Sequence, residues 1–276
     1  MKRYPALDVD STSELLLALV DDCSPTAVEP LGATTRLFFG SQEDRSTAAA
    51  ALHAAGYRTR RVDIDDEDWA RRSQENLAPV TVGRITVAAP WHEGQGHGGI
   101  GESEHKGAAV TVVIVPSMGF GTGHHETTRL CLEALQGLDL RGATVLDAGT
   151  GSGVLAIAAS RLGASEVVGI DNDEDALQAA RQNLALNPEA RHVSFETRDV
   201  TSSDLPRAHV VTANLTGALL LRLSDKVISA LRPGGIAILS GVLAEERDAV
   251  RRAFSAMETV SERQDGEWVG LVLKKA

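Results

Sequence analysis

The second half of the chain alternates short apolar runs with longer segments in which apolar residues recur every three to four positions. Short apolar runs predict β-strands, and helical spacing predicts α-helices between them. The expected strands are 144–147, 166–170, 193–196, 209–213 and 236–240, and the expected helices are 126–135, 154–162, 174–186, 217–231 and 245–257. This alternation predicts an α/β domain with a parallel sheet covered on both faces.

The carboxyl-terminal segment departs from this alternation. Residues 260–264 and 268–273 read as strands on either side of Asp265 and Gly266, a dipeptide typical of hairpin turns. A hairpin at the end of a parallel sheet implies one antiparallel strand.

The amino-terminal part has a different order of elements. We expect strands at 4–9, 27–30, 34–40 and 57–64, and helices at 11–21 and 42–55. Ser11 followed by Glu14 has the spacing of a capping box at a helix start. The order βαββαβ predicts a small ferredoxin-like α+β domain at residues 1–64.

Residues 65–116 are expected to join the two domains, with the larger domain at 117–276. Within this joining segment we expect an acidic helix at 65–76, a strand at 80–89, a glycine-rich flexible loop at 94–107 and a strand at 110–115. A mobile linker between Asp65 and Pro90 would let the two domains change their relative orientation.

Composition narrows the class of protein. The 276 residues carry a formal net charge of −11, which argues against nonspecific nucleic-acid binding. An acidic surface suits a basic protein partner, although it also serves solubility alone. Two cysteines outside any metal-ligand spacing fit a reducing cytoplasm, and no segment reaches the length of a membrane span. We expect a cytoplasmic monomer.

Val145–Ala156 reads V-L-D-A-G-T-G-S-G-V-L-A and carries the first chemical signal. Gly149, Gly151 and Gly153 follow an expected strand and precede an expected helix. Glycines there let a ligand approach the backbone at the carboxyl edge of a parallel sheet. A tight turn without a ligand is the alternative.

Asp171, at the end of the next expected strand, can accept hydrogen bonds from both ribose hydroxyls of an adenosine group. A dinucleotide would favour G-x-G-x-x-G, whereas this loop has G-x-G-x-G directly after Asp147. A carboxylate there disfavours pyrophosphate and suits a cation. We therefore expect S-adenosyl-L-methionine rather than NAD as the cofactor.

These features resemble the class I methyltransferases, which have a Rossmann-like sheet with an antiparallel last strand. The resemblance implies that Asp199, after the third expected strand, lies near the adenine; capping a turn is its alternative role. F-G-T-G-H-H-E-T-T-R-L-C-L at Phe120–Leu132, the glycine loop and A-N-L at Ala213–Leu215 appear in the order found in the PrmA family. The resemblance covers about residue 66 to the end.

The PrmA resemblance implies a protein-lysine methyltransferase whose substrate is ribosomal protein eleven of the large subunit. It places Thr128, Gly149, Asp171 and Asn214 at donor-binding positions, and it implies that the amino-terminal domain recognises the substrate. The chain departs from the family at His124 and Glu126, where Thr and Pro are usual. It also has Leu215-Thr216 where Ile-Leu is usual.

Asn214 is the candidate catalytic residue, because its side-chain oxygen can orient an acceptor amine while staying neutral. Ending a strand is its alternative role. The segment Phe120–Leu132 is expected to open a threonine-capped helix, whose hydroxyls and free N–H groups could hold the donor carboxylate.

Several other residues receive weaker assignments. His124 and His125 could relay a proton but more often serve structure. Trp91, Met118 and Phe120 would shield the donor or pack the domain junction. His92, His97 and His105 lack cysteine partners in a glycine-rich setting, so we expect no metal site.

Three alternatives remain open. The chain could methylate lysines of another protein, or it could methylate RNA or a small molecule. It could also keep the donor pocket as a binding module without activity.

Overall fold

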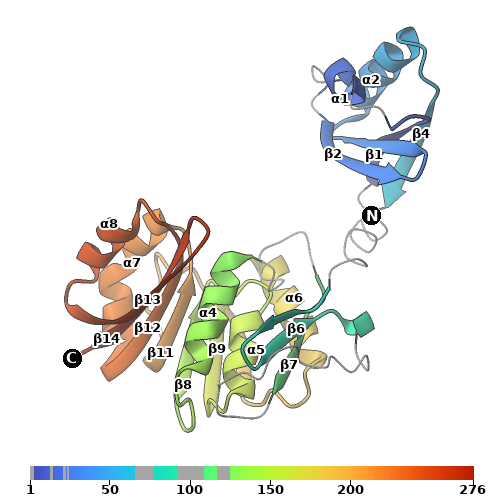
Figure 1. Cartoon of the computed structure of the whole chain (residues 1–276). Helices are drawn as coiled ribbons and strands as arrows, with labels where there is room; N and C mark the ends of the chain where they lie inside the picture. The colour runs from blue at the N-terminus through green and yellow to red at the C-terminus, as the bar shows by residue number, and fades with distance from the viewer. Residues whose placement is uncertain are drawn as a thin grey trace. The chain divides into compact units, whose positions relative to one another are not determined.

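The structure is a computed structural model that describes residues 3–12, 15–20, 23, 25–65, 78–92, 109–116 and 125–276. The chain divides into two compact units, Met1–Asn76 and Leu77–Ala276 (Figure 1). Each unit has its own sheets and core, and the two are described separately.

The first unit is a four-stranded antiparallel sheet with both helices on one face (Figure 1). Its elements are β1 (Arg3–Val9), α1 (Leu15–Val20), β2 (Pro25–Leu31), β3 (Thr34–Phe39), α2 (Gln42–Ala54) and β4 (Thr59–Asp65). The predicted order βαββαβ is confirmed, with strand order β2-β3-β1-β4. Leu7, Val9, Leu37 and Phe39 pack with the helices in a buried cluster. Glu14 of the expected capping box lies outside the described residues.

A row of alternating charges crosses the first unit's sheet. Glu29, Arg36, Asp8 and Arg60 are cross-strand neighbours on β2, β3, β1 and β4. Asp8 accepts hydrogen bonds from Arg36 at 2.5 Å and from Arg60 at 2.7 Å. Burial raises the pKa of Asp8, but the hydrogen bonds and charges of the two arginines outweigh burial, and the net pKa is lowered.

The second unit is built on a seven-stranded sheet with the order β10-β9-β8-β11-β12-β14-β13. Its strands are β8 (Thr144–Ala148), β9 (Glu166–Asp171), β10 (Val193–Thr197), β11 (Ala208–Asn214), β12 (Leu231–Leu243), β13 (Met257–Asp265) and β14 (Trp268–Lys275). Strands β8–β12 pair in parallel, and β14 pairs antiparallel with β12 and β13. The class I methyltransferase sheet with one antiparallel strand is thus confirmed.

Successive strand residues enter two separate cores because their side chains point to opposite faces of the sheet. Val145 and Val210 join a core with α4 (Glu126–Gln136) and α5 (Val154–Arg161). Leu146 and Val211 join a second core with α7 (Gly217–Ala230) and α8 (Arg247–Ala253). Leu184 of α6 (Glu174–Ala185) packs against the first core. The sheet is therefore covered on both faces, as predicted.

The chain reverses direction across the sheet between β8 and β11. From β8 it proceeds to β9 and β10 on one side, and it then crosses to β11 and β12 on the other. Ligands of open α/β sheets bind outside the carboxyl ends of the strands at such a switch point. The predicted site residues after β8, β9 and β11 meet at this edge.

A small sheet of β5 (Val80–Val82), β6 (Ile85–Ala88) and β7 (Val110–Val113) packs on the first core. The single strand expected at 80–89 is wrong: Gly83, with φ of 56°, turns the chain between two antiparallel strands. Gln136, the last residue of α4, bonds this turn, accepting from Arg84 N at 2.9 Å and donating to Val82 O at 3.1 Å.

The helix expected at 245–257 is also too long. The structure ends α8 at Ala253 and starts β13 at Met257. Of the helix expected at 65–76, Asp65 instead ends β4, and residues 66–76 lie outside the described residues, as does the expected loop 94–107. The linker motion between Asp65 and Pro90 stays a prediction.

Candidate functional site

The turn after β8 is shaped by three glycines with positive φ. Gly149, Gly151 and Gly153 have φ of 74°, 53° and 80°, a region in which a Cβ is strained. The backbone N–H groups of Gly149 and Thr150 both donate to the carbonyl oxygen of Ile170, each at 2.9 Å. The glycine loop is therefore fastened to the end of β9.

Two of these glycines also have close neighbours. A Cβ on Gly149 would lie 2.5 Å from Cδ2 of Leu215. A Cβ on Gly153 would lie 2.9 Å from the Phe195 ring and 3.1 Å from Cβ of Ala180. The lack of a side chain at Gly149 thus leaves space on the open side of the loop, whereas the lack of one at Gly153 permits packing beneath the start of α5.

Asp171 lies at the end of β9 and shapes the same loop. Its Oδ2 accepts from Gly151 N at 2.9 Å, and its Oδ1 accepts from Asp173 N at 3.1 Å. Asp173 in turn caps α6 by accepting from Asp175 N. A carboxylate oxygen has more than one acceptor direction, so Asp171 can still accept from a ligand.

Asp199 follows β10 and caps a turn. Its carboxylate accepts from Thr201 N at 2.7 Å, from Thr201 Oγ1 at 2.8 Å and from Ser202 Oγ at 3.0 Å. These hydrogen bonds, led by the one from the Thr201 backbone, lower the pKa of Asp199. The turn-capping role considered from sequence is present, and the side chain also lines the cavity described below.

Asp147 lies beneath the glycine loop rather than in its mouth. The side chain is 1% exposed, and its carboxylate accepts from Thr212 Oγ1 at 2.6 Å and from Thr150 Oγ1 at 2.7 Å. Burial is the main cause of its raised pKa, and the hydrogen bonds oppose that shift. Asp147 therefore joins β8, β11 and the glycine loop from below.

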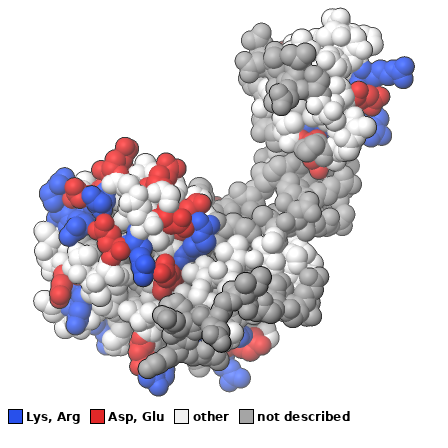
Figure 2. Space-filling model, in the orientation of Figure 1, with Lys and Arg blue, Asp and Glu red and all other residues white. Residues whose placement is uncertain are grey.

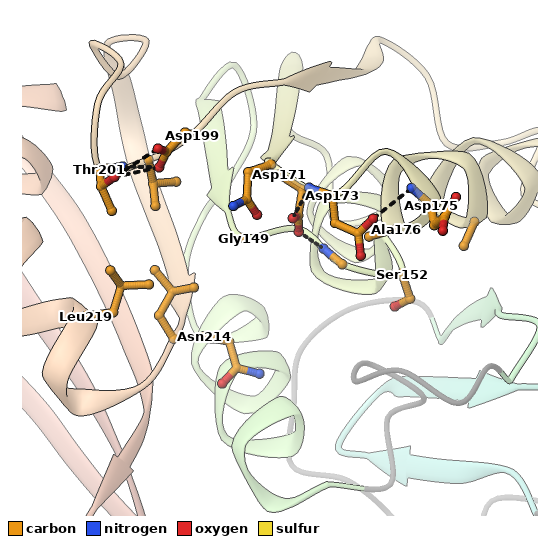
Figure 3. A pocket seen from close by; sticks show the side chains of 15 residues that line it. Gly149, Ser152, Asp171, Asp173, Asp175, Ala176, Asp199, Thr201, Asn214 and Leu219 are labelled. Atoms are coloured by element: carbon orange, nitrogen blue, oxygen red, sulfur yellow. Dashed lines mark hydrogen bonds between the residues drawn. The ribbon is translucent and has the colours of Figure 1, made fainter. Parts of the chain in front are cut away.

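Five of the eight predicted site residues line one cavity of about 670 Å³: Gly149, Gly151, Asp171, Asp199 and Asn214 (Figure 3). Its other lining residues are Ser152, Asn172, Asp173, Asp175, Ala176, Ala179, Val200, Thr201, Leu215 and Leu219. Thr128, Asp147 and Gly153 are not among them. The described lining contains four aspartates and no lysine, arginine or histidine, so it favours a cationic ligand.

Asn214 comes from the carboxyl end of β11 and faces this cavity (Figure 3). Asn214 pairs with Ser240 of the adjacent strand β12, and the Ser240 hydroxyl donates to Val269 O at 3.2 Å. The amide of Asn214 makes no hydrogen bond to another described residue, which leaves it available for a ligand.

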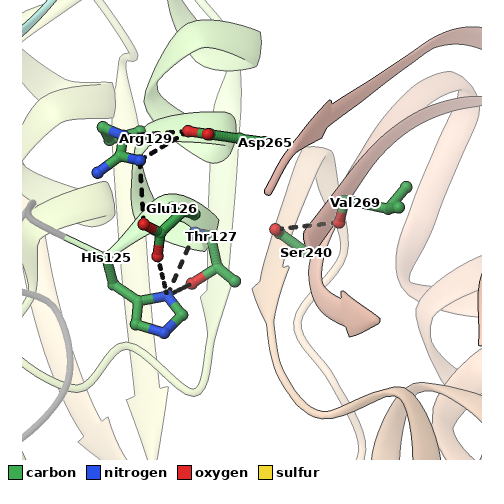
Figure 4. A network of polar contacts seen from close by, with 7 residues as sticks. All are labelled: His125, Glu126, Thr127, Arg129, Ser240, Asp265 and Val269. Carbon is green, nitrogen blue, oxygen red and sulfur yellow. Dashed lines mark hydrogen bonds and ion pairs between the residues drawn. The ribbon is translucent and has the colours of Figure 1, made fainter. Parts of the chain in front are cut away.

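The start of α4 corrects one prediction. The helix cap is His125, whose Nδ1 accepts from Thr127 N at 3.3 Å (Figure 4), and not a threonine. Thr127 and Thr128 are buried within the first turn, and a contact between Thr128 and the donor stays a prediction.

Sequence analysis missed Trp268 as a neighbour of this helix start. The His125 and Trp268 rings meet edge to face, with centroids 5.1 Å apart and planes at 63°. Trp268 begins β14, at the edge where β11 and β12 end. Its position in the sequence, 143 residues after His125, carries no local signal of this contact.

Two buried asparagines, Asn183 in the last turn of α6 and Asn187 two residues beyond its end, were missed as well. Asn183 lies on the face of α6 that also buries Leu177 and Ala180. A polar residue at an apolar position of a helix is the signal that could have found Asn183.

Other expected residues lie outside the described chain, namely His97, His105, Met118, Phe120 and His124. Trp91 and His92 are described and lie side by side, with ring centroids 6.3 Å apart. Among the described residues no cluster of His, Cys, Asp or Glu could hold a metal ion. In the same part of the chain, no helix is both long enough and apolar enough to cross a membrane.

Comparison with known proteins matches most of the chain to one family. The family model described as "Ribosomal protein L11 methyltransferase (PrmA)" matches residues 34–276. A protein of Deinococcus radiodurans named ribosomal protein L11 methyltransferase is 36% identical over 269 residues, which cover 93% of each chain. A protein of the same name from Edwardsiella ictaluri is 37% identical over 257 residues, covering 87% of this chain and 83% of its own.

A solved structure shares the fold. The crystal structure of a ribosomal protein L11 methylase from Lactobacillus delbrueckii subsp. bulgaricus superposes with a TM-score of 0.62 at 24% identity. The match covers 72% of this chain and 99% of that one.

Proposed function

The chain belongs to the PrmA family of ribosomal protein L11 methyltransferases, and from this membership we propose that it transfers methyl groups from S-adenosylmethionine to amines of ribosomal protein L11. The acceptors we propose are lysine side chains and the terminal amine. The observation that carries the proposal is the aspartate-lined cavity at the switch point of the sheet.

The charge of the cavity distinguishes the methyl donor from a dinucleotide. Pyrophosphate needs helix N–H groups or basic side chains, and four aspartates would repel it. S-adenosylmethionine carries an ammonium and a sulfonium and no phosphate. A volume of about 670 Å³ lies within the range of small-molecule sites.

The residues present fit the parts of this donor. Asp171 would accept the ribose hydroxyls, and the turn capped by Asp199 would border the adenine. Gly149 and Gly151 would leave room for the methionine part, and the first turn of α4 with Thr128 would hold its carboxylate. Asp147 would act from beneath the loop by keeping it in place.

When bound, the donor supplies a methyl carbon already activated for displacement by its sulfonium. The chain's task is then to align a neutral amine with that carbon. A lysine has a pKa near 10.4, so its ammonium must first release a proton to water. The Asn214 oxygen would accept a hydrogen bond from the neutral amine and orient its lone pair, without holding a charge that keeps it protonated.

Methyl transfer into purified L11 from labelled donor tests the proposal, with mass spectrometry to locate the label. We expect label on lysine or terminal amines of L11. Asn214→Ala should lower turnover about 100-fold and weaken S-adenosylhomocysteine binding much less, by no more than about tenfold. Label on other proteins alone would retain the methyltransferase and exclude this substrate. Donor binding without transfer to any cell protein would favour a binding module.

We also propose that the protein works in the cytoplasm as a monomer that contacts neither nucleic acid nor membrane. The net charge of −11 supports the first of these exclusions. It also favours a basic protein as substrate. Figure 2 shows acidic and basic side chains interspersed on the visible face, where the acidic side chains do not gather in a single patch.

A further inference from the structure

Asn183 lies in the last turn of α6, Asn187 follows two residues after the helix ends, and each is 1% exposed. A buried amide is costly unless its donor and acceptor groups are bonded. Every bond that the structure gives these two side chains goes to a backbone group, and most of these groups lie outside α6.

Asn187 bonds the free edge of the small sheet. Its Oδ1 accepts from Val113 N at 2.8 Å, and its Nδ2 donates to Val113 O at 2.7 Å. The amide therefore takes the place of a neighbouring strand along β7. Its second donor bond, to Asn183 O at 2.7 Å, reaches back to the last turn of α6.

Asn183 joins two different segments. Its Nδ2 donates to the carbonyl oxygen of Ser152 in the glycine loop at 2.8 Å. Its Oδ1 accepts from Val115 N, beyond the end of β7, at 2.9 Å. Only one orientation of the amide satisfies both partners. The reverse orientation would place Oδ1 against the Ser152 carbonyl oxygen and Nδ2 against the Val115 N–H.

One of these two segments lines the donor cavity, and the other precedes in the sequence the motif that leads into α4. Ser152 lines the cavity itself (Figure 3). Val115 lies five residues before Phe120, where the F-G-T-G segment begins that leads into α4. The helix that carries Asn183 also lines the cavity, through Asp175, Ala176 and Ala179.

We propose that Asn183 is a positioning residue for the methyl donor. Its single amide holds the glycine loop and the chain beyond β7 in a fixed alignment. Asn187, by contrast, only docks the small sheet. This inference rests on the proposed function, since it takes the cavity to be the donor site.

The test compares three alanine variants in the full-length protein, two within α6 and one just after it. Asn183→Ala and Asn187→Ala both remove a buried amide. Gln182→Ala removes an exposed amide and controls for the effect of an alanine substitution as such. Titration calorimetry with S-adenosylhomocysteine is run below the melting temperatures of all three. We expect Asn183→Ala to weaken binding about tenfold, and the other two to change it by less than about twofold.

Equal weakening by Asn183→Ala and Asn187→Ala would overturn the inference, because loss of docking would then explain both. No weakening by Asn183→Ala would overturn it as well. If the unchanged protein binds no S-adenosylhomocysteine, the proposed function fails, and the inference fails with it.

Hydrogen exchange of the unchanged protein gives a second measurement, independent of whether the variants fold. The Val115 amide bonds to Asn183, and the Val113 amide bonds to Asn187. We expect S-adenosylhomocysteine to slow exchange at Val115 at least threefold more than at Val113. Equal slowing at both amides, or slowing at neither, would contradict the inference.

Discussion

Arg129 and Asp265, 136 residues apart in the chain, form an ion pair between the first turn of α4 and the end of β13 (Figure 4). The Arg129 guanidinium donates to Asp265 Oδ2 from Nη2 at 2.7 Å and from Nε at 3.2 Å. Glu126 lies 3.3 Å from the same guanidinium. The β13–β14 turn, with Trp268 after it, is thereby held against the helix start that carries His125.

We expect this pair to contribute little free energy, because the Arg129 and Asp265 side chains are 30% and 43% exposed. A double-mutant cycle of Arg129→Ala and Asp265→Ala, measured by urea unfolding, should give a coupling of about 0.5 kcal/mol. The coupling should shrink in 1 M salt, where the Debye length is about 3 Å. A coupling that is unchanged by salt would contradict a screened ion pair.

Gly149 and Gly142 form a matched pair for testing the glycine loop. Their φ values are 74° and 75°, but a Cβ on Gly149 meets Leu215 at 2.5 Å, whereas a Cβ on Gly142 meets nothing within 4 Å. Alanine at either position should cost about 1–2 kcal/mol of stability through strain. Only Gly149→Ala should also weaken S-adenosylhomocysteine binding, by about tenfold or more.

Equal effects of these two variants on ligand binding, measured by calorimetry, would show that backbone strain alone is responsible. In that case the cavity would not require a glycine at 149.

Asp147 predicts a distinctive pH dependence of stability. Burial raises its pKa in the folded state, so its contribution is fully present below the unfolded pKa and is lost as the pH rises through the folded pKa. Asp147→Asn removes this loss, because one of the Thr150 and Thr212 hydroxyls can accept from the new amide nitrogen while the other still donates to the amide oxygen. The variant should therefore gain stability relative to the unchanged protein as the pH rises from about 4 to 7.

Asp139 supplies a control of opposite sign. Its hydrogen bonds with Arg141 lower its pKa to about 2, so its contribution is present above the unfolded pKa and is lost as the pH falls. Urea unfolding of Asp139→Asn should show the variant losing stability relative to the unchanged protein as the pH rises from about 2 to 4, with little further change from about 4 to 7. Parallel pH profiles for the two variants would contradict the assignment for Asp147.

Asp8 predicts acid sensitivity of the first unit. Its lowered pKa means that its stabilising contribution is present above its ordinary value of 3.8 and is lost as the pH falls through the lower folded value. Asp8→Asn should speed hydrogen exchange of the β1 amides at pH 6 and have little effect near pH 2. Asp10→Asn, at an exposed position after β1, should leave β1 exchange unchanged at both values.

Local pattern was sufficient to predict the alternation of strands and helices in the second unit and the glycine loop between β8 and α5. It failed at 80–89, because the alternation of V-T-V and I-T-V continues across Gly83 and Arg84 as if no turn were present. It failed again near Met257, because the spacing of apolar residues between Ala253 and Met257 also fits a helix.

The residues that surround the site depend on contacts between distant segments. His125 meets Trp268, and Asn187 bonds Val113, 74 residues before it. Such contacts follow from how the layers pack, and propensity or short-range spacing does not encode them. Sequence motifs identified residues that face the cavity, whereas the buried residues that support them became visible only in the structure.

The small sheet and the residues just after β7 are held to the rest of the second unit by the side-chain amides of Gln136, Asn183 and Asn187, in addition to apolar contacts. Apolar contact resists separation of two layers but tolerates sliding of one along the other. Amides that bond single backbone groups select one alignment, because a shift of one layer along the other would break these hydrogen bonds. Because amides carry no charge, this alignment is indifferent to the ionic strength and acidity of the surroundings.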